Sequence, residues 1–270
     1  MYEFAYEKPS SLDEAAKLLQ SSEDAKILAG GQTLIPTLKQ RLAQPSHLID
    51  LQGIGDLSGI SAGGSSITIG ALTTHAAVAA SKDVAKAIPA LAALASHIGD
   101  PQVRNTGTLG GSIANNDPAA DYPAALLGLA AQVRTDRRSI AADDFFTGLY
   151  ETALEPGEIV LAVDFAVPDA AAYMKMPHPA SRFAVVGVFI ARSGAAVRVG
   201  VTGAAAFAFR ATAIEQALGE RFEPGALDGI RIPATEMSSD IHADADYRAH
   251  LVRVMAQRAV AAILAGSAQA

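Results

Sequence analysis

The chain has 270 residues, of which 50% are hydrophobic and 18% are charged, and its formal net charge is -7. This composition predicts a compact globular protein of one large or two medium domains, and the negative charge disfavours nucleic acid or an anionic membrane surface as a partner. The chain contains no cysteine, which excludes disulfides, thiolate zinc sites, cysteine-held iron–sulfur clusters and a cysteine nucleophile.

The start of the sequence lacks a basic segment followed by an apolar run, and no later stretch reads as a membrane span. We therefore expect a cytoplasmic protein without a membrane span.

Residues 1–54 show short strand and helix patterns in alternation. Ser11 followed by Glu14 forms a capping box, which predicts a helix over residues 12–20. Around it we expect strands over 2–6, 26–29 and 47–51, and a helix that carries Leu34, Leu38 and Leu42.

Residues 55–167 begin with an expected strand over 67–69 and a helix over 75–81, which Thr73 or Thr74 caps. A further helix is expected over 89–98. Between residues 99 and 123 the periodicity is lost in a run rich in Gly, Asn, Asp, Thr and Pro, which predicts a functional loop. The remaining expected elements are a helix over 124–129 and strands over 132–135 and 159–165.

The Val-Pro-Asp segment at 167–169 predicts a boundary that divides the chain into domains 1–167 and 168–270. Beyond it we expect strands over 173–176, 185–191 and 196–202, and an amphipathic helix over 246–264. Strands and helices are mixed without a steady βαβ rhythm or an internal repeat, which favours an α+β fold.

Two glycine-rich segments are candidates for binding an anion. The segment 28–34 holds Gly30 and Gly31, and the segment 105–112 holds Gly110 and Gly111, with hydroxyl and amide side chains beside each pair. Paired glycines let backbone N–H groups approach a ligand. Either pair alone reads more often as an ordinary tight turn, but two such loops together suit a diphosphate.

The polar residues after the second loop suit the sugar part of a nucleotide. Asn115, Asn116, Asp117 and Asp121 can donate or accept hydrogen bonds to a ribose or a ribityl chain. The glycine patterns of a Rossmann site and of a P-loop are both absent, which disfavours those two sites.

On these residues the chain resembles the medium, FAD-binding subunits of aerobic carbon monoxide dehydrogenase and related xanthine dehydrogenase-type molybdenum hydroxylases. The resemblance runs nearly end to end and includes segments 29–33, 103–112, 69–75 and 239–248. It implies a vanillyl-alcohol-oxidase-like FAD-binding domain of two subdomains, about 1–54 and 55–167. It also implies a C-terminal α+β domain with a small antiparallel sheet, toward which the isoalloxazine ring of FAD reaches.

The resemblance also carries over to individual residues. Asp121 matches an aspartate on the ribose side of the cofactor, with Asp117 a weaker candidate, and Tyr173 and Lys175 match a pair beside the flavin. Ser112 departs from the aspartate or asparagine of many relatives. The cofactor-binding residues expected in this chain are Leu28, Ala29, Gly30, Gly31, Gln32, Thr33, Leu34, Ala71, Asn105, Thr108, Leu109, Gly110, Gly111, Ser112, Asn115, Asp121, Val160, Tyr173 and Lys175.

The function that the resemblance implies is electron transfer. Substrate would be oxidised on a molybdenum-cofactor large subunit, and electrons would pass through an iron–sulfur small subunit to this FAD and on to oxygen, a quinone or NAD. We expect a dimer of heterotrimers, with no catalytic residue and no metal on this chain. The alternatives are a self-contained flavin reductase or oxidase, such as a relative of UDP-N-acetylenolpyruvylglucosamine reductase, and a non-catalytic nucleotide-binding assembly module.

Several polar residues keep two interpretations at this point. His75 either caps a helix or contacts the flavin, and Arg104 either binds phosphate or forms a salt bridge. His242 among acidic residues before a helix is more typical of helix capping than of a metal site. A bulky residue at Gly31 or Gly110 is expected to abolish FAD retention without unfolding, because the side chain would occupy the position of the diphosphate.

Overall fold

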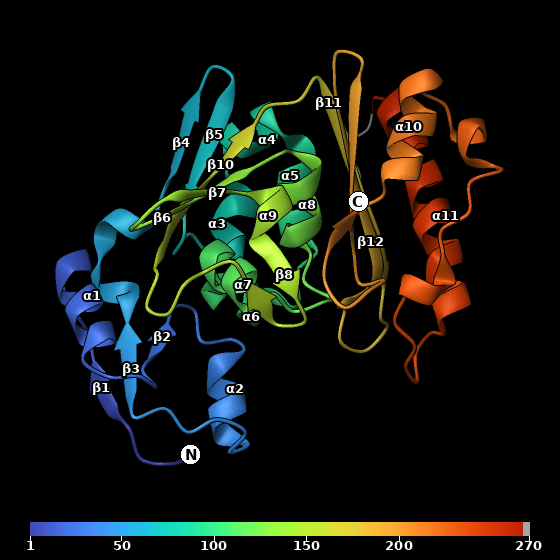
Figure 1. Ribbon diagram of the computed structural model, residues 1–270. Coiled ribbons are helices and arrows are strands. Elements are labelled where there is room, and N and C mark those ends of the chain that lie inside the picture. The colour runs from blue at the N-terminus through green and yellow to red at the C-terminus, as the bar shows by residue number, and fades with distance from the viewer. Residues whose placement is uncertain (267–270) are drawn as a thin grey trace.

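The structure is a computed structural model that describes residues 1–266. Figure 1 shows an N-terminal sheet, a central sheet with its helices, and a C-terminal sheet that α10 and α11 cover on the side away from the centre. Among the described residues, none of the helices has the length and hydropathy needed to cross a membrane.

The N-terminal region is a three-stranded parallel sheet with the order β1-β3-β2. Its elements are β1 (Ala5–Glu7), α1 (Leu12–Gln20), β2 (Lys26–Leu28), α2 (Leu34–Lys39) and β3 (His47–Asp50). The Ser11 hydroxyl accepts a hydrogen bond from the Glu14 N–H, so α1 begins where the capping box predicts. The strand expected over residues 2–6 begins later, and α2 ends before Leu42, which is 74% exposed.

The central sheet is antiparallel and has the order β4-β5-β10-β6-β7. Its strands are β4 (Ile60–Gly63), β5 (Ser66–Gly70), β10 (Val160–Ala166), β6 (Gln132–Thr135) and β7 (Ser139–Ala141). A small hairpin of β8 (Phe146–Gly148) and β9 (Glu151–Thr152) lies between β7 and β10 in the sequence. The sequence pattern predicts β5, β6 and β10, but the short strands β4, β7, β8 and β9 are too brief to give a period of their own.

Helices pack against the central sheet and enclose the largest core cluster. They are α3 (His75–Ala80), α4 (Lys82–Ala87), α5 (Pro89–Ser96), α6 (Pro101–Thr106), α7 (Leu109–Asn115), α8 (Tyr122–Gly128) and α9 (Ala142–Phe145). The loop expected between residues 99 and 123 is therefore wrong in part, because α6 and α7 lie within it. The polar residues there are caps: Asp100 accepts from the Val103 N–H at 2.9 Å, and Thr108 accepts from the Gly111 N–H at 3.1 Å.

The C-terminal sheet is antiparallel, with the order β11-β12-β13-β14. Its strands are β11 (Ala170–Pro177), β12 (Ala184–Ser193), β13 (Ala196–Thr202) and β14 (Phe209–Arg210), and its helices are α10 (Thr212–Glu220) and α11 (Ala245–Leu264). Short 3-10 helices lie at Leu51–Gly53, Gly55–Leu57, Pro224–Leu227 and Ala234–Glu236.

Both faces of the C-terminal sheet are buried. Tyr173 and Phe189 belong to the core cluster of the central region, whereas Ala172 and Val188 belong to the cluster beneath α10 and α11. A side chain at Gly200 would lie 2.1 Å from the Ala124 carbonyl oxygen, so α8 packs directly on β13. This packing confirms the α+β class and the small antiparallel sheet. The domain division near residue 167 stays an interpretation, because α8 joins the two cores.

Candidate functional site

One cavity of about 640 Å³ runs between the N-terminal sheet, the central region and the hairpin loop of β11 and β12. Its size lies within the range of about 300 to 1,000 Å³ that is usual for cofactor sites. Most of the expected cofactor-binding residues line it: Ala29, Gly30, Gly31, Gln32, Thr33, Leu34, Ala71, Thr108, Gly110, Gly111, Ser112, Asn115, Asp121 and Val160.

The first glycine loop presents open backbone donors to this cavity. No hydrogen bond joins the N–H groups of residues 30–33 to another described residue, although the Gly31 carbonyl accepts from the Ile35 N–H at 3.0 Å. Gly31 has a φ of 69°, a conformation that glycine adopts at little cost. The loop therefore offers several free N–H groups of the kind that bind phosphate oxygens.

The second glycine loop does not repeat this arrangement. The Gly110 N–H donates to the Ala71 carbonyl at 2.8 Å, and the Leu109 N–H donates to the Thr73 carbonyl at 3.1 Å. The Gly111 N–H is already bonded to the hydroxyl of Thr108. The second loop thus uses its backbone donors to hold its own shape, and it lines the cavity with small residues, namely Gly110, Gly111 and Ser112.

The glycines also let the two loops pack against neighbouring backbone. A Cβ at Gly30 would lie 2.1 Å from the Thr106 carbonyl oxygen, and one at Gly110 would lie 2.6 Å from the Cβ of Ala71. A side chain at Gly110 would therefore strike protein atoms, and one at Gly31 would meet Ile35 at 2.9 Å. The expectation that such variants stay folded because the side chain enters only the diphosphate position has no support in this geometry.

A buried ion pair adjoins the cavity. The carboxylate of Asp121 lines the cavity and accepts a hydrogen bond of 2.5 Å from the Tyr173 hydroxyl. The ammonium of Lys175 lies 2.9 Å from the same carboxylate and also donates to the His97 carbonyl. Burial raises the pKa of the Asp121 carboxyl, whereas the Lys175 charge and the two hydrogen bonds act in the opposite direction.

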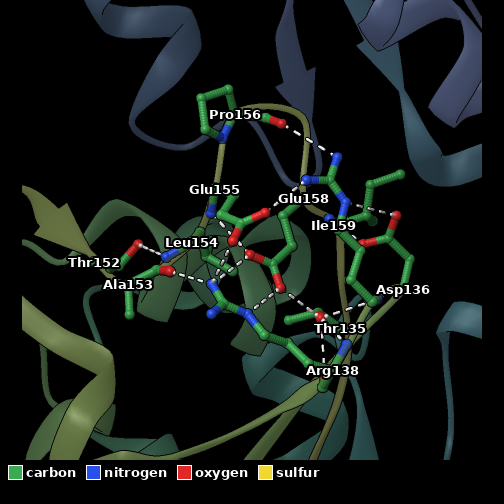
Figure 2. Close-up of polar contacts among 11 residues, drawn as sticks. Thr135, Asp136, Arg138, Thr152, Ala153, Leu154, Glu155, Pro156, Glu158 and Ile159 are labelled. Atoms are coloured by element: carbon green, nitrogen blue, oxygen red, sulfur yellow. Dashed lines mark hydrogen bonds and ion pairs between the residues drawn. The ribbon is translucent and has the colours of Figure 1, made fainter.

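A second buried carboxylate, Glu158, lines the cavity next to the turn before β10. Figure 2 shows it surrounded by donors: the Thr135 hydroxyl at 2.7 Å, the Glu155 N–H at 2.8 Å and the Arg138 guanidinium at 3.0 Å. The hydrogen bond from Arg138 is the main cause that lowers the pKa of Glu158 to about 2. Glu158 is therefore a fixed anion at neutral pH.

His75 and Arg104 have separate positions. The His75 ring lines the cavity, and its Nδ1 has no hydrogen-bond partner among the described residues. Burial, assisted by the positive charge of Arg104, lowers the pKa of His75 to about 4, so the ring is neutral. Arg104 does not line the cavity, because its guanidinium donates to the carbonyls of Ile98 and Gly99.

Some expected residues lie outside the cavity lining. Leu28 is in β2, Asn105 lies in α6, and Leu109 is fully buried in the core. Tyr173 and Lys175 reach the cavity only through Asp121, so a direct contact with the cofactor stays a prediction. Among the polar residues after the second loop, Asp117 lines the cavity, but the Asn116 amide donates to the carbonyls of Gly148 and Glu151.

Several lining residues were not expected from the sequence. They include Leu154, Glu158 and the hairpin residues Ala180 to Phe183. A sequence signal could have marked Leu154 and Glu158. Gly157 forms a turn, and Glu158 follows it shortly before a strand. The hairpin gives no comparable signal, because its position depends on how the C-terminal sheet packs against the central region.

The residues present fit FAD. Free N–H groups of the first loop lie along the cavity, Ile27, Leu51 and Ile159 supply apolar surface, and Asp121 supplies a carboxylate. A dinucleotide needs these three kinds of surface for its diphosphate, its base and its polar ring edges. No group of three or more His, Cys, Asp or Glu side chains that could hold a metal is found within residues 1–266.

Comparison with known proteins gives consistent matches. Residues 2–168 match the family described as the FAD binding domain in molybdopterin dehydrogenase. The chain is 38% identical to the carbon monoxide dehydrogenase medium chain of Hydrogenophaga pseudoflava, over 95% of this chain and 96% of that one. It is 36% identical to the nicotine 6-hydroxylase medium subunit of Paenarthrobacter nicotinovorans, over 94% and 95% of the two chains.

Solved structures match to the same extent. A chain of carbon monoxide dehydrogenase from Hydrogenophaga pseudoflava superimposes with a TM-score of 0.89 at 36% identity, over 99% of both chains. A chain of quinoline 2-oxidoreductase from Pseudomonas putida 86 gives a TM-score of 0.86 at 30% identity, over 98% of both.

Proposed function

The chain belongs to the family of FAD-binding domains found in molybdopterin dehydrogenases, and from that premise we propose that it is the FAD-carrying, electron-transfer subunit of a molybdenum hydroxylase. Its similarity to medium subunits extends over nearly the whole chain, including the C-terminal sheet, and therefore supports this function for all of it. The hydroxylation itself belongs to a partner chain.

The observation that carries the proposal is the single cavity that both glycine loops share with Asp121 and Glu158. The open N–H groups of residues 30–33 would bind the diphosphate, and the small surfaces at Gly110 and Gly111 would let it approach. The Lys175 ammonium neutralises the buried Asp121 carboxylate, so this part of the lining would not repel a flavin ring that gains negative charge. When bound, FAD supplies the ability to accept electrons and to pass them to an acceptor.

The partners follow from what this chain lacks and from what its relatives are. The sequence has no cysteine to hold an iron–sulfur cluster, and the relatives are medium subunits of molybdenum hydroxylases. An iron–sulfur small subunit and a molybdenum-cofactor large subunit would therefore complete the electron path. We further propose a dimer of such heterotrimers in the cytoplasm, with oxygen, a quinone or NAD as the acceptor.

The test is to produce the chain alone and together with the products of its neighbouring genes, and to measure flavin and partners. We expect FAD, seen as an absorption band at about 450 nm, and co-purification of iron–sulfur and molybdenum subunits. Failure to retain or take up FAD in either form would leave the assembly-module alternative. Oxidation of a substrate by the isolated chain would favour the self-contained flavoenzyme.

A further inference from the structure

Two parts of the cavity lining differ in chemistry. Ile27 of β2 and Leu51 belong to the same hydrophobic cluster as Ile159, and together with Leu154 they give this part of the lining an apolar surface. The other part, next to the C-terminal sheet, holds Asp121 with its buried cation. Figure 1 shows the N-terminal and the C-terminal sheet on opposite sides of the central region.

If the chain binds FAD, as the proposed function requires, this difference indicates which half of FAD lies at each part of the cavity. Adenine is a flat, uncharged base that apolar side chains can cover on its faces. The isoalloxazine ring has polar edges and changes its charge when it accepts electrons, so it suits the end where the Asp121–Lys175 ion pair supplies charged groups. The adenosine half therefore faces the segment between β9 and β10.

That segment, residues 153–159, has no helix or strand of its own and is held by side chains (Figure 2). Glu158 accepts from the Glu155 N–H at 2.8 Å, which closes the turn. Arg138 donates to the Ala153 carbonyl at 2.6 Å and to the Glu158 carboxylate at 3.0 Å, which joins the two ends of the segment.

The anchor of this network is the neighbouring turn between β6 and β7. The hydroxyl of Thr135 donates to Glu158 at 2.7 Å, and the carboxylate of Asp136 accepts from the Ile159 N–H at 2.8 Å. The Glu158 side chain is 0% exposed and reaches four donors, so its carboxylate has one fixed position. A buried anion with this many donors holds the backbone around it in a single arrangement.

We propose that Glu158, together with Arg138, positions segment 153–159, which forms a wall of the cavity, to receive the adenosine half of FAD, and so sets the preference of this chain for FAD over FMN. Glu158 is a positioning residue, because it acts through the backbone and apolar side chains of the wall. A wall that is already ordered binds the adenosine without first losing conformational freedom, and that saving appears only for ligands that carry adenosine.

The experiment compares Glu158→Gln with Asp164→Asn on the full chain, in the assembly in which the wild type binds FAD, after removal of the flavin. Asp164 on β10 is a matched control, because it also accepts from a threonine hydroxyl, that of Thr68, and pairs with an arginine, Arg134. Unlike Glu158, it does not line the cavity. Dissociation constants for FAD, ADP and FMN are measured by flavin fluorescence and competition.

For Glu158→Gln we expect affinity for FAD and ADP to fall about tenfold, and affinity for FMN to change less than about twofold. Asp164→Asn should leave all three affinities within about twofold. Arg138→Gln should reproduce the loss in part, and Arg138→Lys should restore some of it, which a general loss of stability would not do. If Glu158→Gln does not fold, the two Arg138 variants decide the question.

Equal losses of FMN and FAD affinity in Glu158→Gln would overturn the proposal, because they would place the flavin ring at this wall. Unchanged FAD and ADP affinities would also overturn it and would leave Glu158 a purely structural residue. Failure of the wild type to bind FAD is a different outcome, which contradicts the proposed function itself.

Discussion

Asp121 and Glu158 are two buried carboxylates that line the same cavity, each paired with a basic side chain, yet their pKa values shift in opposite directions. Glu158 receives four donors, two of them from one guanidinium, and its pKa falls to about 2. Asp121 receives the Tyr173 hydroxyl and the Lys175 ammonium, and burial raises its pKa. The supply of donors, and not burial alone, decides the charge state that a buried acid prefers.

The two basic partners differ as well. The Lys175 side chain is 6% exposed, whereas the Arg138 side chain is 43% exposed. Both members of the Asp121 pair have therefore lost their water, but only one member of the Glu158 pair has. We expect the stability of the protein to fall further when the Asp121 pair loses its basic partner than when the Glu158 pair does.

The largest expected effect is the loss of the buried cation. Lys175→Met leaves the Asp121 carboxylate buried without a counter-charge, which should lower the free energy of unfolding by about 3 to 5 kcal/mol. The measurement is urea denaturation at neutral pH. Asp121→Asn combined with Lys175→Met should recover most of the loss. If the double variant is as unstable as the single one, then the ion pair is not the cause.

The next effect concerns His75, which lies close to the same end. The pKa of its imidazole is about 4 in the folded protein against 6.5 unfolded, so folding favours the neutral ring. The corresponding stability is fully present above about pH 6.5 and is lost as the pH falls to about 4, by at most about 3 kcal/mol. His75→Phe should flatten the pH dependence of unfolding over this window. An unchanged slope would mean that the ring is not held neutral.

A smaller effect separates the two carboxylates by the sign of their pH dependence. The lowered pKa of Glu158 gives stability that is present above about pH 4.5 and is lost as the pH falls toward about 2. The raised pKa of Asp121 has the opposite sign, so its contribution decreases as the pH rises above 3.8.

The measurement for this contrast is urea unfolding between about pH 3 and 6. The stability difference between the wild type and Glu158→Gln should grow with pH. The difference between the wild type and Asp121→Asn should shrink. Slopes of the same sign for both variants would contradict the contrast between the two ends.

The sequence predicted the parts of the fold and site that local chemistry decides. The capping box at Ser11 placed α1, the glycine pair at Gly30 and Gly31 marked the open loop, and Asp121 was found among the polar residues that line the cavity. These features depend on residues that are near one another in the chain. The resemblance to a flavoprotein family then supplied the cofactor.

What the sequence did not predict depends on contacts between distant segments. The Glu158 network joins two turns that lie about twenty residues apart, so no local pattern identifies the glutamate as buried. The same reason explains the second glycine loop: its donors bond to Ala71 and Thr73, which a reading of the loop alone cannot show. Tyr173 and Lys175 point at Asp121 only because the C-terminal sheet packs on α8.

The smallest expected loss of stability is that of Asp164, which has the same kinds of partner as Glu158 but is more exposed to solvent. Asp164 has a threonine and an arginine as partners, but its side chain is 32% exposed and that of Arg134 is 49% exposed. Water therefore competes for both charges, and Asp164→Asn should lower the free energy of unfolding by less than about 1 kcal/mol. Urea denaturation beside Glu158→Gln gives the comparison. A loss for Asp164→Asn as large as that for Glu158→Gln would show that the arginine and threonine partners alone set the stability, and that burial at the cavity adds nothing to it.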